Sequence, residues 1–490
     1  MVLIFVFSFA LCVLLTGLVK RLAERFGFLD RPAGEEKKHH TRPVPLLGGI
    51  AIFLTIAIVT TIVLLTSNAL TFGLMNNAHF IGFLLGGFVL MIGGALDDRF
   101  ALPARFTIWF PTLAALIAVA FGIGVAKLSN PFGEPIELSA LGSGILTFSW
   151  LLIVMYTTKF LDGLDGLATG VSAIGVLFMT LLALTATYLQ LDAALFGALC
   201  LGALLGFLVW NHHPAKIFLG EGGSTFVGYT LGVMAVIAGS KFGTALLVLS
   251  IPFLDVLWVI GRRIFVEHRS PTRGDRKHLH HRLLDMDFSH RGIVFLYYAL
   301  AAAAGTAGLF LQSQQKVFAF IALALLMIIC AVMIVGASRR VGFVVGVVAA
   351  VLIFTYLFVF GRVGESGQAL TKRMLSFDQG PTLSVEIADE LSEQVIGLSF
   401  RDALAPDHGM LFVYPQKDQR LFWMKDMKFA IDIVWIADGT VVGIDANVQP
   451  PSNANETPKI YPSPTAVDEA LEVPAGYMQA HSLTVRARLK

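Results

Sequence analysis

The sequence predicts a polytopic α-helical membrane protein with about 11 or 12 transmembrane helices, followed by a small, mostly β soluble domain. Three observations support this fold class. Of the 490 residues, 56% are hydrophobic and only 14% are charged, whereas soluble domains carry about a quarter of charged residues. Apolar runs long enough to cross a bilayer as a helix recur up to residue 360. Beyond about residue 375 the density of charge becomes ordinary. The net charge of +2 gives no indication of a nucleic-acid partner.

Twelve apolar runs define the predicted spans in order. They are Val2–Val19, Gly48–Thr66, Phe80–Leu96, Phe106–Val125, Leu141–Tyr156, Leu167–Tyr188, Ala193–Trp210, Phe226–Ala238, Ala245–Ile260, Gly292–Leu311, Val317–Ala337 and Val341–Phe360. The first run has neither a charged n-region nor a small-residue cleavage site, so we expect a retained helix and not a signal peptide. Cys12, Cys200 and Cys330 each lie inside an apolar run. They are interpreted as small buried hydrophobic residues.

The distribution of Lys and Arg between the spans predicts the orientation. Alternate loops, beginning with the one after the first helix, hold 21 of these residues, and the intervening loops hold only Lys127, Lys241 and Lys316. Because cytoplasmic loops are enriched in Lys and Arg, the first set is predicted to be cytoplasmic and the N-terminus to lie outside. Arg339-Arg340 precedes a last run and favours twelve spans, which would place the C-terminal domain outside the cytoplasm. Eleven spans would place it inside.

The change in composition after residue 360 predicts three segments: a membrane domain at 1–361, a linker at 362–375 and a β-rich domain at 376–490. In the last segment, short apolar stretches (383–388, 409–414, 431–444 and 482–489) alternate with turn signals. Asp438-Gly439 lies between two such stretches and predicts a β-hairpin.

The polar residues of the membrane domain collect in the predicted cytoplasmic loops, and two groups of carboxylates stand out. Asp97-Asp98-Arg99 ends the third span. Adjacent carboxylates repel each other, and with a phosphorylated substrate they suit Mg²⁺, although an isolated pair is more often a solvated helix end. Asp162 and Asp165 lie three residues apart in FLDGLDGLATG, where the glycines permit tight turns or close ligand approach. A capped helix start would explain one of these two aspartates.

Two further loops carry groups suited to phosphate. In NHHPAKIFLGEGGSTFVG (211–228) a glycine-rich turn precedes a helix, whose first N–H groups can bind phosphate, and Glu221 is a candidate metal ligand or base. An ordinary capped loop is an equally good interpretation. In the basic loop at 262–283, His278, His280 and His281 lie among arginines and Lys277. Without a cysteine or a fourth ligand nearby, this loop favours binding of a polyanion such as a diphosphate over a zinc site.

Together the four loops predict phosphoryl transfer to or from a lipid at the cytoplasmic membrane surface. Two alternatives from other classes remain open. Twelve helices would also suit a transporter of lipid-linked sugars, although the carboxylates gather at one membrane face and no matching pair of broken helices is evident. An inactive membrane scaffold for the β domain is the other alternative.

In order and spacing, the four motifs and KKHHTRPVPLLGGIAIF (37–53) resemble the polyprenyl-phosphate N-acetylhexosamine-1-phosphate transferases over about residues 1–340. The resemblance implies a bacterial inner-membrane enzyme of cell-wall or polysaccharide biosynthesis. Such an enzyme transfers the sugar 1-phosphate of a UDP-N-acetylhexosamine (UDP-GlcNAc, for example) to undecaprenyl phosphate and releases UMP. It implies Mg²⁺, with Mn²⁺ as an alternative.

The resemblance also implies residue roles. Catalysis falls to Asp97, Asp98, Asp162 and Asp165, and metal binding to Asp98, Asp165 and Glu221. Substrate binding falls to Lys159, Asn211, Arg263, His278, His280 and His281. Glu221 stands where members commonly have Asp, and Lys159 where many have Asn. These departures bear on metal geometry and sugar preference, and they are the only support for the scaffold alternative.

The C-terminal part resembles a second family, of secreted or membrane-anchored β domains with no assigned activity. Arg401, Trp423, Met424, Asp432 and Glu472 occupy motif positions of that family. Core and turn roles are the favoured interpretation of these residues. The predicted location implies an extracytoplasmic partner.

Overall fold

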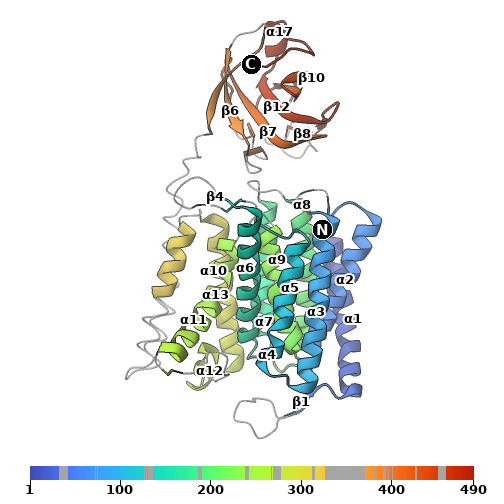
Figure 1. Ribbon diagram of the computed structural model, residues 1–490, viewed down its shortest axis with the longest axis vertical. Helices are drawn as coiled ribbons and strands as arrows, with labels where there is room; N and C mark the ends of the chain where they lie inside the picture. Colours follow the sequence, from blue (N-terminus) through green and yellow to red (C-terminus); the bar gives the residue numbers. More distant parts are fainter. Residues whose placement is uncertain are drawn as a thin grey trace. The chain divides into compact units, whose positions relative to one another are not determined.

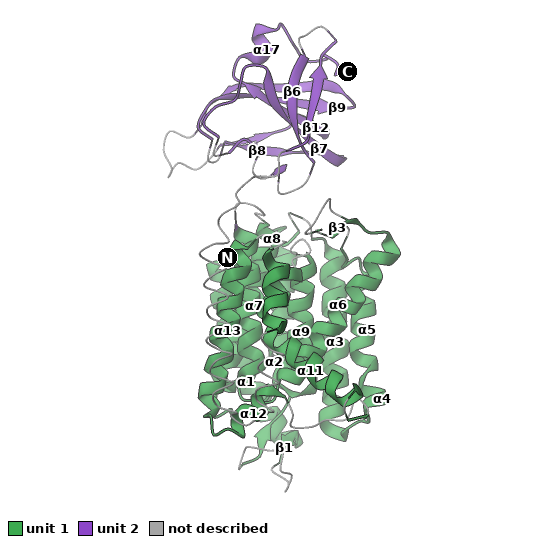
Figure 2. Cartoon of the chain, turned by 90° about the vertical axis from the view of Figure 1, so that its left-hand side faces the viewer, with its two compact units in different colours: residues 1–184, 190–364 green, residues 185–189, 365–490 purple. Residues whose placement is uncertain are grey.

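The computed structural model describes most of the chain, in two compact units. The described residues are 1–31, 42–71, 73, 75–125, 127–128, 130, 136–185, 190–237, 242–265, 267–268, 278–311, 315–325, 370–378, 382–389, 393–394, 397–399, 401–424, 427–450 and 459–489. The first unit comprises Met1–Leu184 and Gln190–Gly364, and the second comprises Thr185–Leu189 and Glu365–Lys490 (Figure 2). Arg273, Arg276, Lys277, Cys330, Arg339-Arg340 and the run 341–360 lie outside the described residues.

The first unit is a bundle of helices (Figure 1). In chain order they are α1 (Val2–Phe26), α2 (Gly48–Thr66), α3 (Asn77–Phe100), α4 (Ala104–Thr107), α5 (Trp109–Ala120), α6 (Ala140–Leu161), α7 (Leu167–Leu184), α8 (Leu191–Asn211), α9 (Gly220–Ile237), α10 (Phe242–Val248), α11 (Ser250–Phe265), α12 (Leu279–Leu284) and α13 (His290–Phe310), followed by a helix at Gln315–Leu325. The short ribbons β1 (Leu29–Asp30) with β2 (Val44–Pro45), and β3 (Lys127–Leu128) with β4 (Ile136–Glu137), lie in its loops.

Seven helices of the described residues are long and apolar enough to cross a membrane: α1, α2, α3, α6, α7, α8 and α13. The bent pair α10–α11 makes an eighth. The predicted run at 106–125 is divided between α4 and α5, and that at 245–260 between α10 and α11, with a bend of 75° in the second. Pro111 and Pro252 explain both breaks, because proline has no N–H to donate to the carbonyl four residues before it. These carbonyls belong to Thr107 and Val248, the last residues of α4 and α10.

Helix α9 lies in the interior and packs against α2, α3, α6 and α7. It is buried from Gly222 to Val236. A Cβ atom on Gly94 of α3 would lie 2.1 Å from the Cα of Gly222, and one on Gly49 of α2 would lie 2.1 Å from the Cα of Gly223. The glycines at the start of α9 therefore permit close helix packing, as small residues do in membrane proteins.

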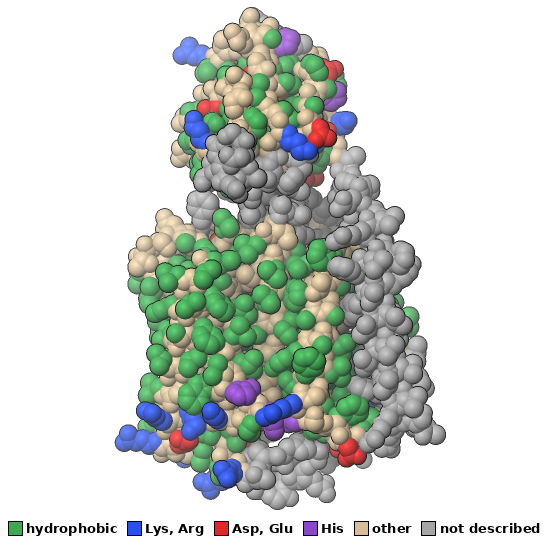
Figure 3. Space-filling model, turned by 180° about the vertical axis from the view of Figure 1, so that it is seen from behind, with side chains coloured by type: hydrophobic (Ala, Val, Ile, Leu, Met, Phe, Trp, Pro, Cys, Tyr) green, Lys and Arg blue, Asp and Glu red, His purple; other side chains and the backbone are tan. Residues whose placement is uncertain are grey.

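Lys and Arg side chains gather at one end of the bundle, and apolar side chains cover its flank (Figure 3). This is the end where α3 stops and α12 lies, and the N-terminus lies at the opposite end (Figure 1). The side-chain distribution therefore matches a bundle that crosses a bilayer with one strongly basic face.

The second unit is built on a mixed six-stranded sheet of order β10-β9-β12-β7-β6-β5, with a two-stranded sheet of β11 and β8. Its elements are β5 (Lys372–Ser376), β6 (Thr382–Ala388), β7 (His408–Asp418), β8 (Leu421–Trp423), β9 (Ile431–Ala437), β10 (Thr440–Val448), β11 (Ile460–Pro462), β12 (Val467–Pro474) and the short helix α17 (Tyr477–Ala480). Two clusters of buried apolar side chains form its core, one around Leu411 and Val434 and the other around Phe412 and Trp435.

The predicted hairpin at Asp438-Gly439 is confirmed. It joins β9 to β10, and both turn residues have positive φ angles (50° and 66°), as a type I′ turn requires. The predicted stretch at 482–489 is not a strand and forms only isolated bridges, at Arg488 and Leu489. Positive φ angles at Ser482 (56°) and Arg486 (81°) interrupt its extended backbone.

Candidate active site at the basic end of the helical unit

Four segments that are distant in sequence end at the basic face of the bundle. They are the last turn of α3, the loop from α6 to α7, the loop from α8 to α9, and α12 with the start of α13 (Figure 1). These segments carry the four predicted constellations. The structure therefore brings the predicted groups to one end of the bundle.

The last turn of α3 is joined to the first turn of α9 through Asp98. Its Oδ1 atom accepts a hydrogen bond from the backbone N–H of Glu221 at 3.1 Å. Gly220 has a φ angle of +75°, and a Cβ atom there would lie 2.4 Å from Oδ2 of Asp98, so only glycine leaves room for this carboxylate. Asp97 accepts the N–H of Leu102 at 2.9 Å and closes the helix end. An N–H group that was expected to bind phosphate thus binds Asp98 instead.

Glu221 pairs with a cation of the chain itself. The Nζ atom of Lys159, in the last turn of α6, lies 2.7 Å from Oε2 of Glu221, and the two side chains are 25% and 43% exposed. The two positions that depart from the family pattern are thus in direct contact. The Lys159 ammonium partly neutralises a cluster of carboxylates that would otherwise repel one another.

Asp162 follows α6 at the centre of the carboxylates. Its side chain is exposed at the end of the bundle. Desolvation by the surrounding protein atoms and the charges of Glu221, Asp98 and Asp165 raise its pKa to about 8. Such a shift is typical of carboxylates gathered in a functional site. A Cβ atom on the next residue, Gly163, would lie 2.3 Å from Nε2 of His280, so this glycine admits a histidine of the predicted triplet.

Asp165 is held by the loop from α8 to α9. Its Oδ2 atom lies 2.7 Å from Nδ1 of His213 and accepts the N–H of Ala215 at 3.1 Å. The ring of His213 stacks on that of His290, with centroids 4.1 Å apart. Of the three predicted metal ligands, Asp98 and Glu221 are joined by the hydrogen bond from the Glu221 N–H to the Asp98 carboxylate. Asp165 is instead hydrogen-bonded to His213 and Ala215.

The predicted substrate-binding residues fall into two groups. Asn211 is buried, and both ends of its amide are engaged: it accepts the Thr169 hydroxyl and donates to the carbonyl of Ile217, each at 3.0 Å. This arrangement ties α7 and α8 to the loop before α9. Arg263 is also buried. In the second group, His280 is also buried; it lies beside His281, with ring centroids 4.3 Å apart, and reaches Gly163.

His278 is fixed by an aspartate that sequence reasoning did not single out. Its Nδ1 atom lies 2.8 Å from Oδ2 of Asp255 in α11, whose Oδ1 accepts the N–H of Leu279 at 2.9 Å. His213 and His290 were also missed, although His213 belongs to the NHHPAKIF motif. Nothing in the sequence places His290 beside that motif, because 77 positions separate the two histidines.

In the second unit most of the motif residues have structural roles, and one of them is a buried carboxyl, described below. Asp432 is fully buried and accepts the N–H groups of Asn447, Gly476 and Met478, a turn role as predicted. Met424 is buried in the core, and Trp423 is 40% exposed. The Arg401 guanidinium makes two hydrogen bonds to Glu386, and this partner holds the pKa of Glu386 below its usual range.

Glu472 is 5% exposed, and its Oε2 atom has no hydrogen-bond partner among the described residues. It lies beside Met410 of β7, which in turn lies beside Glu386 of β6. Burial raises the pKa of Glu472 to about 8, although the charge of Arg401 opposes the shift. The carboxyl is thus predicted to be largely protonated at neutral pH.

Comparison with known proteins gives two family matches. Residues 80–239 match the model of glycosyl transferase family 4, and residues 374–490 match that of a family described as Uncharacterized ACR. The first match spans the end of α3, the loop from α6 to α7 and the start of α9, the segments that carry the candidate site's carboxylates.

Relatives of the helical unit have names that specify a reaction. A probable undecaprenyl-phosphate N-acetylglucosaminyl 1-phosphate transferase of Bacillus subtilis is 30% identical over 318 residues, covering 63% of this chain and 84% of that protein. A decaprenyl-phosphate N-acetylglucosaminephosphotransferase of Mycolicibacterium smegmatis is 34% identical, covering 58% and 75%. An undecaprenyl-phosphate alpha-N-acetylglucosaminyl 1-phosphate transferase of Thermotoga maritima is 30% identical, covering 54% and 76%.

The gathered carboxylates, the membrane-embedded bundle and the extent of these matches lead to one conclusion. The chain belongs to glycosyl transferase family 4, as a multi-pass membrane sugar-phosphate transferase that carries an additional C-terminal β domain.

Proposed function

We propose that this protein transfers N-acetylhexosamine 1-phosphate from a UDP-sugar to undecaprenyl phosphate. A phosphate oxygen of the lipid attacks the β-phosphorus of the UDP-sugar. The bond from that phosphorus to the oxygen bridging the two phosphates breaks, UMP leaves, and an undecaprenyl-diphospho-sugar remains. The convergence of Asp97, Asp98, Asp162 and Glu221 at one end of an apolar bundle is the observation that carries this proposal.

The arrangement of the carboxylates suggests a division of labour. Asp98 is fixed by the N–H of Glu221 through Oδ1, which leaves Oδ2 to face a ligand. Asp162, exposed at the end of the bundle and with a raised pKa, is suited to exchange a proton with a lipid phosphate near neutral pH. The histidines of α12 and Lys159 offer donors for the diphosphate.

Mg²⁺ fits the donor set at Asp98 and Glu221. Both are hard carboxylate ligands, and Mg²⁺ is commonly held by one or two carboxylates plus substrate phosphates. Gly220 keeps the space beside Oδ2 of Asp98 free of a side chain. When bound, Mg²⁺ would neutralise charge that develops on the transferring phosphate. Mn²⁺ has similar ligand preferences.

The basic end of the bundle would face the cytoplasm of a bacterial inner membrane, where nucleotide sugars are available. The distribution of Lys and Arg supports this orientation. The C-terminal domain would then act on the other side, on an extracytoplasmic partner, if the predicted twelfth span crosses the membrane. The proposed product would initiate a cell-envelope glycan.

A transporter of lipid-linked sugars is not favoured, because the relatives are transferases. A radiochemical assay tests the proposal: purified protein is mixed with labelled UDP-N-acetylglucosamine and undecaprenyl phosphate, and label is measured in the organic phase. We expect transfer only with lipid and divalent metal present. UDP-N-acetylgalactosamine in a parallel reaction identifies the preferred sugar. An absence of transfer with either sugar would favour the inactive scaffold.

A further inference from the structure

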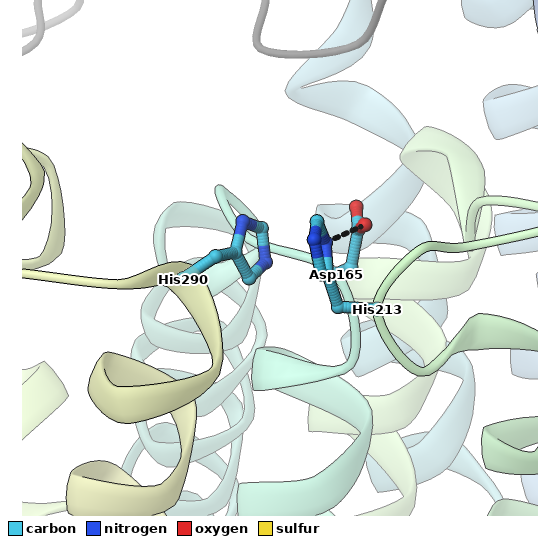
Figure 4. Close-up of side chains that lie close together, drawn as sticks. All are labelled: Asp165, His213 and His290. Atoms are coloured by element: carbon cyan, nitrogen blue, oxygen red, sulfur yellow. Dashed lines mark hydrogen bonds and ion pairs between the residues drawn. The ribbon is translucent and has the colours of Figure 1, made fainter.

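Asp165, His213 and His290 lie together although they come from three separate segments (Figure 4). Asp165 precedes α7, His213 follows α8, and His290 is the first residue of α13. One potential ligand atom from each lies within 4.8 Å of the other two. The group is distinct from the contact between Asp98 and Glu221, where Mg²⁺ is proposed.

We propose that Asp165, His213 and His290 bind a divalent transition-metal ion of the Zn²⁺ class. Two imidazoles and one carboxylate are a common protein donor set for such ions, whereas Mg²⁺ prefers oxygen ligands alone. A three-residue site would leave a coordination position for water or a substrate oxygen. This proposal does not depend on the transferase reaction.

The surroundings of the group support a metal site. The N–H of Ala215 donates to Oδ2 of Asp165, and second contacts of this kind orient metal-binding carboxylates. Arg291 donates to the backbone carbonyl of His213 at 3.3 Å and so anchors the loop. His290 is the first residue of α13, so a regular helix fixes its position beside His213.

The positions of the side chains also permit entry. His213 and Asp165 are 37% and 18% exposed, so an ion can reach them from solvent. The two stacked rings lie 4.1 Å apart and are inclined at 22°.

The metal alone tests the proposal, using the full chain in detergent without a polyhistidine tag. After treatment with a chelator, the protein is titrated with Co²⁺, whose visible absorption reports nitrogen coordination, and with Zn²⁺ in competition. We expect one tightly bound ion per chain, and His213→Ala or His290→Ala should weaken binding by about 100-fold or more.

Three control variants make the result specific. His212→Ala removes the neighbouring exposed histidine, whose Nδ1 lies 3.3 Å from the carbonyl of Leu208 in its own helix, and it should leave binding unchanged. His281→Ala should also retain the Co²⁺ spectrum. Binding that survives His213→Ala and His290→Ala, or that is lost in His281→Ala, would overturn the proposal, as would the absence of stoichiometric binding. Glu221→Gln separates this ion from Mg²⁺, since it should spare the Co²⁺ site.

Discussion

The ammonium of Lys159 lies 2.7 Å from the carboxylate of Glu221, so two residues that depart together from the family pattern form one ion pair. The pair joins the last turn of α6 to the first turn of α9, across the carboxylate cluster. A lysine in this place is a built-in monovalent cation beside a predicted metal ligand. It therefore competes with a divalent ion for Glu221.

The first prediction follows from that competition. Lys159→Asn should raise the affinity for Mn²⁺, measured by electron paramagnetic resonance of the free ion. A partly exposed ion pair is worth about 1 kcal/mol, which corresponds to a gain of roughly five-fold. Lys20→Asn is a matched control, because Lys20 pairs with Glu24 on α1 at 2.6 Å. If both variants raise the affinity for Mn²⁺ equally, the rise comes from long-range charge and not from the ion pair with Glu221. Unchanged binding in Lys159→Asn would remove Glu221 from the metal site.

The second prediction concerns charge at Asp98. Asp98→Asn keeps an oxygen that can accept the N–H of Glu221, so the variant should insert and accumulate normally. Its turnover should fall by at least about 10²-fold, as losses of positioned charge in active sites commonly do. Asp97→Asn and Asp165→Asn should also lower turnover strongly. Retention of more than about a tenth of the wild-type rate in all three variants would favour the scaffold alternative.

The third prediction concerns the side of the membrane on which the β domain lies. Asp402 is 91% exposed, so a cysteine there should react with a membrane-impermeant maleimide in intact cells with a permeable outer barrier. Native Cys12 and Cys200 are buried, and Cys330 is replaced by serine beforehand. Protection of position 402 until the inner membrane is lysed would indicate eleven spans and a cytoplasmic domain.

The fourth prediction is a pH dependence in the β domain. The pKa of Glu472 is raised from 4.5 to about 8, so between these values the unfolded domain releases a proton that the folded domain keeps. Stability should therefore fall as pH rises through this window, by up to about 1.4 kcal/mol per unit. Glu472→Gln should lose less stability over the same range. Thermal proteolysis of the intact protein, with cleavage sites in 370–490 read by mass spectrometry, measures the difference. Parallel pH profiles of the two proteins would show that this carboxyl is ionised in the fold.

Hydrophobic runs predicted most of the helices because a bilayer imposes length and composition directly. The run Gly48–Thr66 coincides with α2, whereas Pro111 and Pro252 divided two other runs in ways that hydropathy alone does not reveal. The motifs predicted which loops meet. They did not predict the contact between Lys159 and Glu221 or that between His213 and His290, because side-chain pairing depends on how helix ends pack. The same packing gives Gly222 and Gly223 a structural role in the close approach of α9 to α3 and α2, which the motif did not reveal.

The product that contains the β-phosphorus of the UDP-sugar after the reaction tests the central claim most directly. With UDP-N-acetylhexosamine labelled at that atom, undecaprenyl phosphate and Mg²⁺, sugar-1-phosphate transfer moves the label into the organic phase together with the sugar. One UMP is released for each lipid formed. Label released to water as UDP, with sugar alone on the lipid, would contradict the proposed reaction. So would nucleotide release that continues without lipid or in excess chelator.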